Sequence, residues 1–273
     1  MYSFLEKKKK KDKQANYIFV VLFLILGLGL AYLVFVNFTQ IKVSEIDGCP
    51  LDGAHGTTVV LFDNTDAYLP IEEVDLRENL LKIKNSVPKY QKLAIYIITE
   101  DPNVVTPVLE RCNPGSMKDE NKFAFLYKTP RIVQEKWEKH FGEDIDNIIS
   151  KLLKGGVSDW SPIFEMIRSV NVASLKHSRP DYSDNNRLFI FSDFIHNTPQ
   201  FSQYQDKSSF DTFKANYPDY YDSIYSMLRN TYVKLFFVKR QSGHTREIMD
   251  FWKDYFLTVE AKNGVVDISV IGK

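Results

Sequence analysis

The feature that most limits the possible structures of this chain is a run of twenty residues without a charged side chain, Tyr17 to Val36. At about 1.5 Å per residue, a helix of this length spans the ~30 Å hydrocarbon core of a bilayer. A buried core helix of this length would normally have a polar face, and this segment has none. A cleaved signal peptide usually has a shorter apolar region of ~7–15 residues and a small-x-small cleavage site, and no clear site of that kind follows Val36. We therefore expect a retained transmembrane helix over residues 17–37.

The charges on either side of this segment predict its orientation. Residues 1–16 contain six lysines against Glu6 and Asp12, a net charge of +4, and only Lys42 follows the segment closely. The positive-inside rule then places this basic tail in the cytoplasm and the chain from about residue 38 outside. We expect a single-pass protein of the inner (cytoplasmic) membrane, with its folded domain in the periplasm or outside.

The net charge of the folded part gives no reason to expect nucleic-acid binding. The whole chain has a formal net charge of zero, so the residues after the basic tail sum to 0 minus 4, or −4. A slightly acidic domain lacks the basic surface that binding to phosphate backbones requires.

The chain contains two cysteines, Cys49 just before the first predicted strand and Cys112 in a loop after the second. In an exported domain a pair so placed favours a disulfide, although two unpaired thiols remain an alternative. Metal binding by two isolated cysteines without a CxxC spacing is not expected.

The rest of the chain alternates between patterns typical of strands and of helices. Residues 38–56 are polar and contain several glycines, as expected of a linker, and a folded domain is predicted over 57–273. Apolar runs predict buried strands over 57–63, 92–99, 187–193, 231–240 and 265–271, with a short edge strand over 104–109. Amphipathic spacing predicts helices over 71–87, 131–153 and 245–256, and a further helix with Ser161 as its N-cap. This alternation predicts an α/β domain with a doubly wound, mainly parallel sheet and helices on both faces.

Polar residues follow two of the predicted strands at the edge where parallel strands end. Asp63 follows VVLF, Thr65 comes two residues later, Asp193 follows FIFS, and Ser161 comes after the GGVSDW loop. In open parallel sheets, ligands bind beyond the carboxyl ends of the strands. Carboxylates and hydroxyls without histidine or cysteine suit a hard cation such as Mg²⁺. The same residue types also cap turns and helices, and this purely structural interpretation stays open.

The order of these three loops resembles a von Willebrand factor type A (vWA) domain, over roughly Thr57 to Ile271. In that family a metal-ion-dependent adhesion site takes ligands from an Asp-x-Ser-x-Ser loop, a hydroxyl of a second loop and an aspartate of a third. The resemblance implies four ligands of Mg²⁺ or another divalent cation: Asp63 and Thr65 in the first loop, Ser161 in the second and Asp193 in the third.

The first loop departs from the family pattern at one position. The final serine of the motif falls at Ala67, which has no oxygen in its side chain. Asp66, which is not a motif position, is a candidate substitute. The expected site is therefore degenerate.

The resemblance implies a membrane-anchored protein-binding module, not an enzyme, whose partner binds at the carboxyl rim of the strands as part of a bacterial envelope assembly. One alternative is a haloacid-dehalogenase-like phosphatase with Asp63 as nucleophile, but that chemistry needs a second aspartate two residues on, where Thr65 stands. Another is a structural subunit with no metal.

His196 follows the third buried strand, and a lone histidine in a loop is expected at the surface.

Overall fold

The chain divides into two units, Met1–Lys42 and Val43–Lys273. The computed structural model describes residues 17–32, 34–35, 41–101, 105–120, 128–154, 156, 158–239, 245–262 and 266–272. In the first unit, residues 17–32 are helical and exposed. The part of the chain that is described contains no helix both long and apolar enough to cross a membrane. The predicted transmembrane segment over residues 17–37 lies partly outside the described residues, and the basic tail over 1–16 lies wholly outside them.

The second unit is built on a six-stranded sheet in the order β3-β2-β1-β4-β5-β6. Its strands are β1 (Thr57–Asp63), β2 (Lys92–Ile98), β3 (Leu109–Cys112), β4 (Asn186–Ser192), β5 (Thr231–Val238) and β6 (Asp267–Ile271). Neighbouring strands are parallel except β2 and β3, which are antiparallel. The expected α/β fold with a mainly parallel sheet is confirmed. Winding reverses between β1 and β4, so the carboxyl ends of these two strands lie side by side at the point where such sheets bind ligands.

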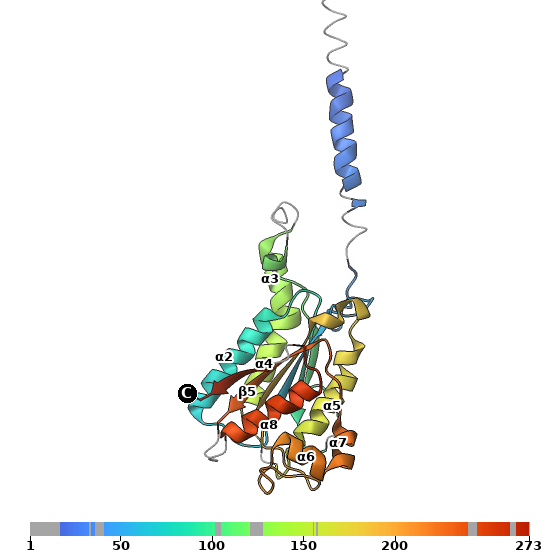
Figure 1. The fold of residues 1–273 in the computed structure, drawn as a ribbon. Helices are drawn as coiled ribbons and strands as arrows, with labels where there is room; N and C mark the ends of the chain where they lie inside the picture. Colours follow the sequence, from blue (N-terminus) through green and yellow to red (C-terminus); the bar gives the residue numbers. More distant parts are fainter. Residues whose placement is uncertain are drawn as a thin grey trace, which may run out of the picture. The chain divides into compact units, whose positions relative to one another are not determined.

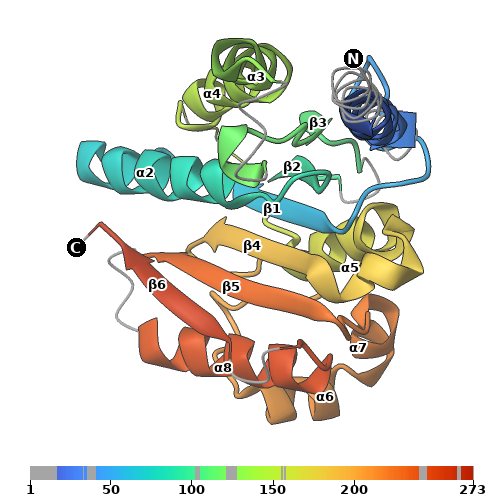
Figure 2. The same cartoon turned by 90° about the horizontal axis from the view of Figure 1, so that it is seen from above.

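Helices cover both faces of this sheet, as Figures 1 and 2 show. One face packs against α2 (Pro70–Ser86) and α4 (Glu143–Leu152), and the other against α5 (Ile163–Ala173) and α8 (Thr245–Thr258). Two short helices, α6 (Phe210–Asn216) and α7 (Pro218–Ile224), extend the second layer. Alternate residues of β1 therefore enter different cores, which is why Val59 to Phe62 form a continuous apolar run.

The predicted helix over 131–153 forms as one helical stretch with an irregular middle. It consists of α3 (Pro130–Trp137), a π-helical segment (Glu138–Gly142) and α4. The widened turn brings Phe141 into the core beside α4, where its side chain is fully buried.

The edge strand lies further along the chain than predicted. The apolar run over 104–109 suggested a strand, but β3 begins at Leu109 and ends at Cys112. Residue 104 lies outside the described residues, and the pairing with β2 starts at Leu109, which is in register with Ile95. Cys112, predicted to lie in a loop, is instead the last residue of β3.

Much of the predicted linker over 38–56 belongs to the folded unit. Cys49 and Cys112 form a disulfide, which confirms that prediction. Val43 makes an antiparallel bridge with Pro50, and the His55 N–H donates to the Tyr90 carbonyl at 3.0 Å. The segment from Val43 is therefore fastened beside the start of β2.

Candidate functional site

The predicted site lies at the carboxyl ends of β1 and β4. Phe62 of β1 is in register with Phe191 of β4, so the next residues, Asp63 and Ser192, stand side by side. Asp63 is the last residue of β1 and is only 4% exposed. A carboxylate buried to this extent needs hydrogen-bond donors or a cation to replace the water it has lost.

Three hydroxyl groups and one backbone amide supply those donors. Oδ1 of Asp63 accepts from the Thr65 hydroxyl at 2.7 Å and from the Thr65 N–H at 3.2 Å. Oδ2 accepts from the Ser192 hydroxyl at 2.6 Å and from the Ser161 hydroxyl at 3.1 Å. The structure thus brings together three of the four principal predicted ligands, Asp63, Thr65 and Ser161. It adds Ser192, which the sequence analysis did not identify.

The sequence predicted Ser161 as the N-cap of the following helix, and this prediction is wrong. Ser161 reaches Asp63 instead. The N-cap of α5 is Pro162, and its cap position makes no side-chain hydrogen bond. Ser161 instead pairs with Asn197 through two backbone hydrogen bonds, of 2.9 and 3.1 Å. This pairing fixes the backbone and leaves the serine hydroxyl directed at the carboxylate.

The loop before Ser161 also packs closely on the loop after β1. The Ser158 N–H donates to the Thr65 carbonyl at 3.1 Å. At Gly156, a Cβ would lie 2.5 Å from the Asn64 carbonyl oxygen, so only glycine permits this approach. The GG-containing loop therefore holds the residues around Asp63 in place.

Asp193 lies next to this cluster, at the start of the loop after β4. Its Oδ1 accepts from the Ile195 N–H at 2.9 Å, which closes a turn. Phe194 has a positive φ of 58°, a conformation that bulky residues rarely adopt. It is held by its N–H, which donates to the Ser192 hydroxyl at 2.8 Å, and by its carbonyl, which accepts from the Trp252 indole at 2.8 Å.

The two remaining positions of the first loop face solvent. Asp66 and Ala67 are exposed, and Tyr68 donates its hydroxyl to the Asp63 carbonyl. Across the described ranges, no group of three or more histidine, cysteine, aspartate or glutamate side chains has the arrangement of a metal site. A cation at this rim would instead be held mainly by hydroxyl oxygens around Asp63, a donor set that suits Mg²⁺ or Mn²⁺ better than zinc.

His196 is buried, contrary to the prediction of a surface histidine. Its side chain has no exposed area and packs against Phe164 and Phe201. Burial lowers the pKa of this imidazole to about 3, so the ring is neutral at ordinary pH. Its Nε2 lies 2.9 Å from the Tyr220 hydroxyl, which in turn donates to Oε1 of Glu165 at 2.5 Å.

This histidine, tyrosine and glutamate form one buried chain of hydrogen bonds. The Tyr220 proton goes to Glu165, so the 2.9 Å bond is made by a proton on Nε2 of His196. Burial raises the pKa of the Glu165 carboxyl, and burial together with the nearby Glu165 charge raises the pKa of the Tyr220 hydroxyl. The sequence signal, an isolated histidine near the rim, did not identify these two partners.

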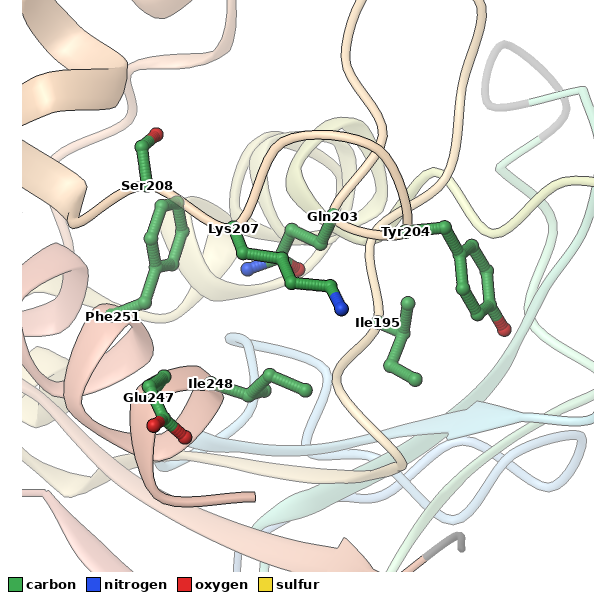
Figure 3. A pocket seen from close by; sticks show the side chains of 8 residues that line it. All are labelled: Ile195, Gln203, Tyr204, Lys207, Ser208, Glu247, Ile248 and Phe251. Carbon is green, nitrogen blue, oxygen red and sulfur yellow. The ribbon is translucent and has the colours of Figure 1, made fainter. Parts of the chain in front are cut away.

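Two hollows open near the same edge of the sheet. The larger, of about 690 Å³, lies beside the Ser158–Trp160 loop, and Glu165 and Tyr220 contribute to its wall. The smaller, of about 90 Å³, lies between the loop after β4 and α8. In Figure 3, Gln203, Tyr204 and Lys207 come from the loop, and Ile248 and Phe251 from α8.

No protein-family model matches this chain, and no curated protein matches it. The geometry of the rim is therefore what bears on its function.

Proposed function

We propose that the chain is a membrane-anchored, vWA-like protein-binding module whose partner binds at the carboxyl ends of β1 and β4. The observation that carries this proposal is the convergence of three hydroxyls on the buried carboxylate of Asp63, from the loop after β1, the loop before α5 and the end of β4. A cap or a turn needs one or two local bonds, whereas Ser161 is 98 residues away in the sequence and Ser192 is 129. An arrangement that joins distant loops at the switch point of the sheet is typical of a binding site.

A divalent cation fits this donor set. Asp63 and Asp193 would provide negative charge, and the hydroxyl oxygens of Thr65, Ser161 and Ser192 would provide neutral ligands. The bound ion would present an open position toward solvent, where a carboxylate of a protein partner completes its coordination. Ala67 contributes no ligand, so the site would bind its ion more weakly than one with a complete first loop.

The anchor places this module at a membrane. Residues 17–37 would span the bilayer once, with the basic tail in the cytoplasm and the domain in the periplasm or outside. The disulfide between Cys49 and Cys112 supports an oxidising compartment for the folded unit. A partner in the same envelope assembly would therefore meet the rim outside the cytoplasm.

Site-specific photo-crosslinking in the producing cells tests this proposal. A photoreactive amino acid replaces exposed Ala67 at the rim, and in a matched strain it replaces exposed Asp184, just before β4 at the opposite edge. We expect a discrete crosslinked protein from position 67 that is lost with Asp63→Ala, and none from position 184. Crosslinks that are the same at both positions, or that persist in the Asp63→Ala background, would refute binding at this rim.

A further inference from the structure

The larger hollow has an acidic lining. Its described lining residues include three carboxylates, Glu100, Asp101 and Glu165, and no lysine or arginine. Trp160 and Tyr220 supply aromatic surface, and Pro162 and Pro199 supply prolyl surface. We call this hollow the acidic groove. Its volume of about 690 Å³ is within the range of ligand pockets.

Glu165 lacks a counter-charge among the described residues. Its Oε1 accepts from Tyr220, whereas its Oε2 is buried and has no hydrogen-bond partner in the described part of the chain. The pKa of this carboxyl is raised, mainly by burial. A half-buried carboxylate without a counter-charge is poorly compensated, so a cation placed beside it in the groove would offset part of its desolvation cost.

The neighbours of Glu165 cannot provide this missing donor. Tyr220 has one hydroxyl proton, and Oε1 already takes it. His196 is neutral, and its single ring proton is directed at Tyr220. Among the described side chains, neither of these two compensates the charge of Glu165.

The rest of the groove favours a planar cation. Trp160 is 46% exposed and lines the groove, so its ring is available for stacking. Glu100 stands at the same hollow and is held by the Ser158 hydroxyl at 3.0 Å and the Asp159 N–H at 3.2 Å. A guanidinium stacks on aromatic rings and presents five donors in a plane, which suits an aromatic wall flanked by carboxylates better than an ammonium does.

We infer that the acidic groove binds an arginine side chain of a protein partner, with its guanidinium held by the negative charge of Glu165 and Glu100 and stacked on Trp160. This inference rests on the proposed function, because it assigns a chemistry to the partner that binds at the rim. It does not require the cation at Asp63, so the two sites fail or succeed separately.

Fluorine NMR of the full chain in detergent tests this inference. The protein contains three tryptophans, so 5-fluorotryptophan labelling gives three signals, and Trp160→Phe identifies the one from the groove. The probe is Nα-acetyl-arginine methylamide, and the control is the citrulline analogue, which has the same shape without the charge. Both are titrated in EDTA, so that no divalent cation contributes.

We expect the arginine probe to shift the Trp160 signal alone, with a dissociation constant on the order of 1–10 mM for so small a ligand. Citrulline should leave the signal unchanged. Glu165→Gln should weaken binding at least about tenfold, since it removes the charge and keeps the shape of the side chain. Asp159→Asn, which neutralises a carboxylate that does not line the groove, is the matched control and should bind as the wild type does.

Three results would overturn the inference: no saturable shift of Trp160 up to about 50 mM probe, equal binding of citrulline, or unchanged binding by Glu165→Gln. If Glu165→Gln does not fold, Trp160→Leu takes its place as the test variant. Its affinity for the arginine probe is then measured by calorimetry, and the fluorine signals of the two remaining tryptophans show whether it is folded. Loss of cation-dependent stabilisation at Asp63 with intact arginine binding would reject only the metal site.

Discussion

Ala67 is the residue at which this rim departs from a complete vWA-type first loop. Because position 67 carries no oxygen in its side chain, Ala67→Ser should restore a hydroxyl ligand beside Thr65. We expect the affinity for Mn²⁺ to rise on the order of tenfold, the value of one additional hydrogen-bond-strength contact to a charged group. Calorimetric titration measures this change, with Ala67→Val as a control that enlarges the side chain without adding an oxygen. Equal affinities in the two variants would show that position 67 does not contact the ion.

The burial of His196 predicts how the free energy of unfolding depends on pH. Its pKa is about 3 in the fold and ordinary in the unfolded chain, so its contribution to stability is present above about pH 6.5 and is lost as the pH falls toward 3. Between pH 7 and pH 5 this loss amounts to about 2 kcal/mol. Glu165, whose pKa is raised, titrates in the opposite sense, so the histidine must be isolated by comparison.

Urea unfolding of the wild type and of His196→Gln at pH 7 and pH 5 provides that comparison. The variant should be less stable at pH 7, and its stability should fall less between the two pH values, by about 2 kcal/mol. An equal fall in both proteins would mean that the imidazole is not buried in its neutral form.

Site residues could be predicted from the sequence where they lie at or near the end of a strand. Asp63, Thr65 and Ser161 were predicted to lie together and do so, because the carboxyl ends of parallel strands meet at one edge. Ser192 was missed although it precedes Asp193, since its alignment with Asp63 depends on the register between β1 and β4. The burial of His196 depends on phenylalanines from two other segments, which no local pattern reports.

At the scale of elements, the buried strands were easier to predict than the edge. The centre of TTVVLFD is a continuous apolar run because both faces of the strand are covered, and β1 has the predicted bounds. The edge strand β3 has the sequence LERC, only four residues long and without polar–apolar alternation, and the disulfide holds its last residue, Cys112. Short edges carry little periodicity, so tertiary contacts decide where they pair.

The disulfide is the element-scale feature with the largest expected effect on stability. It joins residues 63 positions apart, so its removal releases a long loop in the unfolded chain. Cys49→Ser/Cys112→Ser should lower the free energy of unfolding by about 2–4 kcal/mol. Urea denaturation of the variant and of the oxidised wild type measures the difference. Equal midpoints would show that the bridge contributes no net stability.

At the scale of the whole molecule, the chain divides between Lys42 and Val43. We expect the two units to differ in their association with the membrane. If residues 17–37 span a bilayer, the full chain should remain in the membrane pellet after extraction with alkaline carbonate. A chain that starts at Val43 should stay in the supernatant and keep the circular dichroism of an α/β domain, since the sheet and its disulfide lie within this unit. Release of the full chain by carbonate would contradict the anchor.

We propose that Asp63 and the hydroxyls around it bind a divalent cation. The most direct test is thermal unfolding of the full chain in detergent, in EDTA and with Mg²⁺ or Mn²⁺, for the wild type, Asp63→Ala and the exposed control Asp184→Ala. A cation at a hundredfold excess over its dissociation constant should stabilise the native state by about 2.7 kcal/mol, or raise Tm by roughly 5–10 °C. We expect this rise for the wild type and for Asp184→Ala, and none for Asp63→Ala. No rise in the wild type, or an equal rise in all three proteins, would exclude cation binding at Asp63.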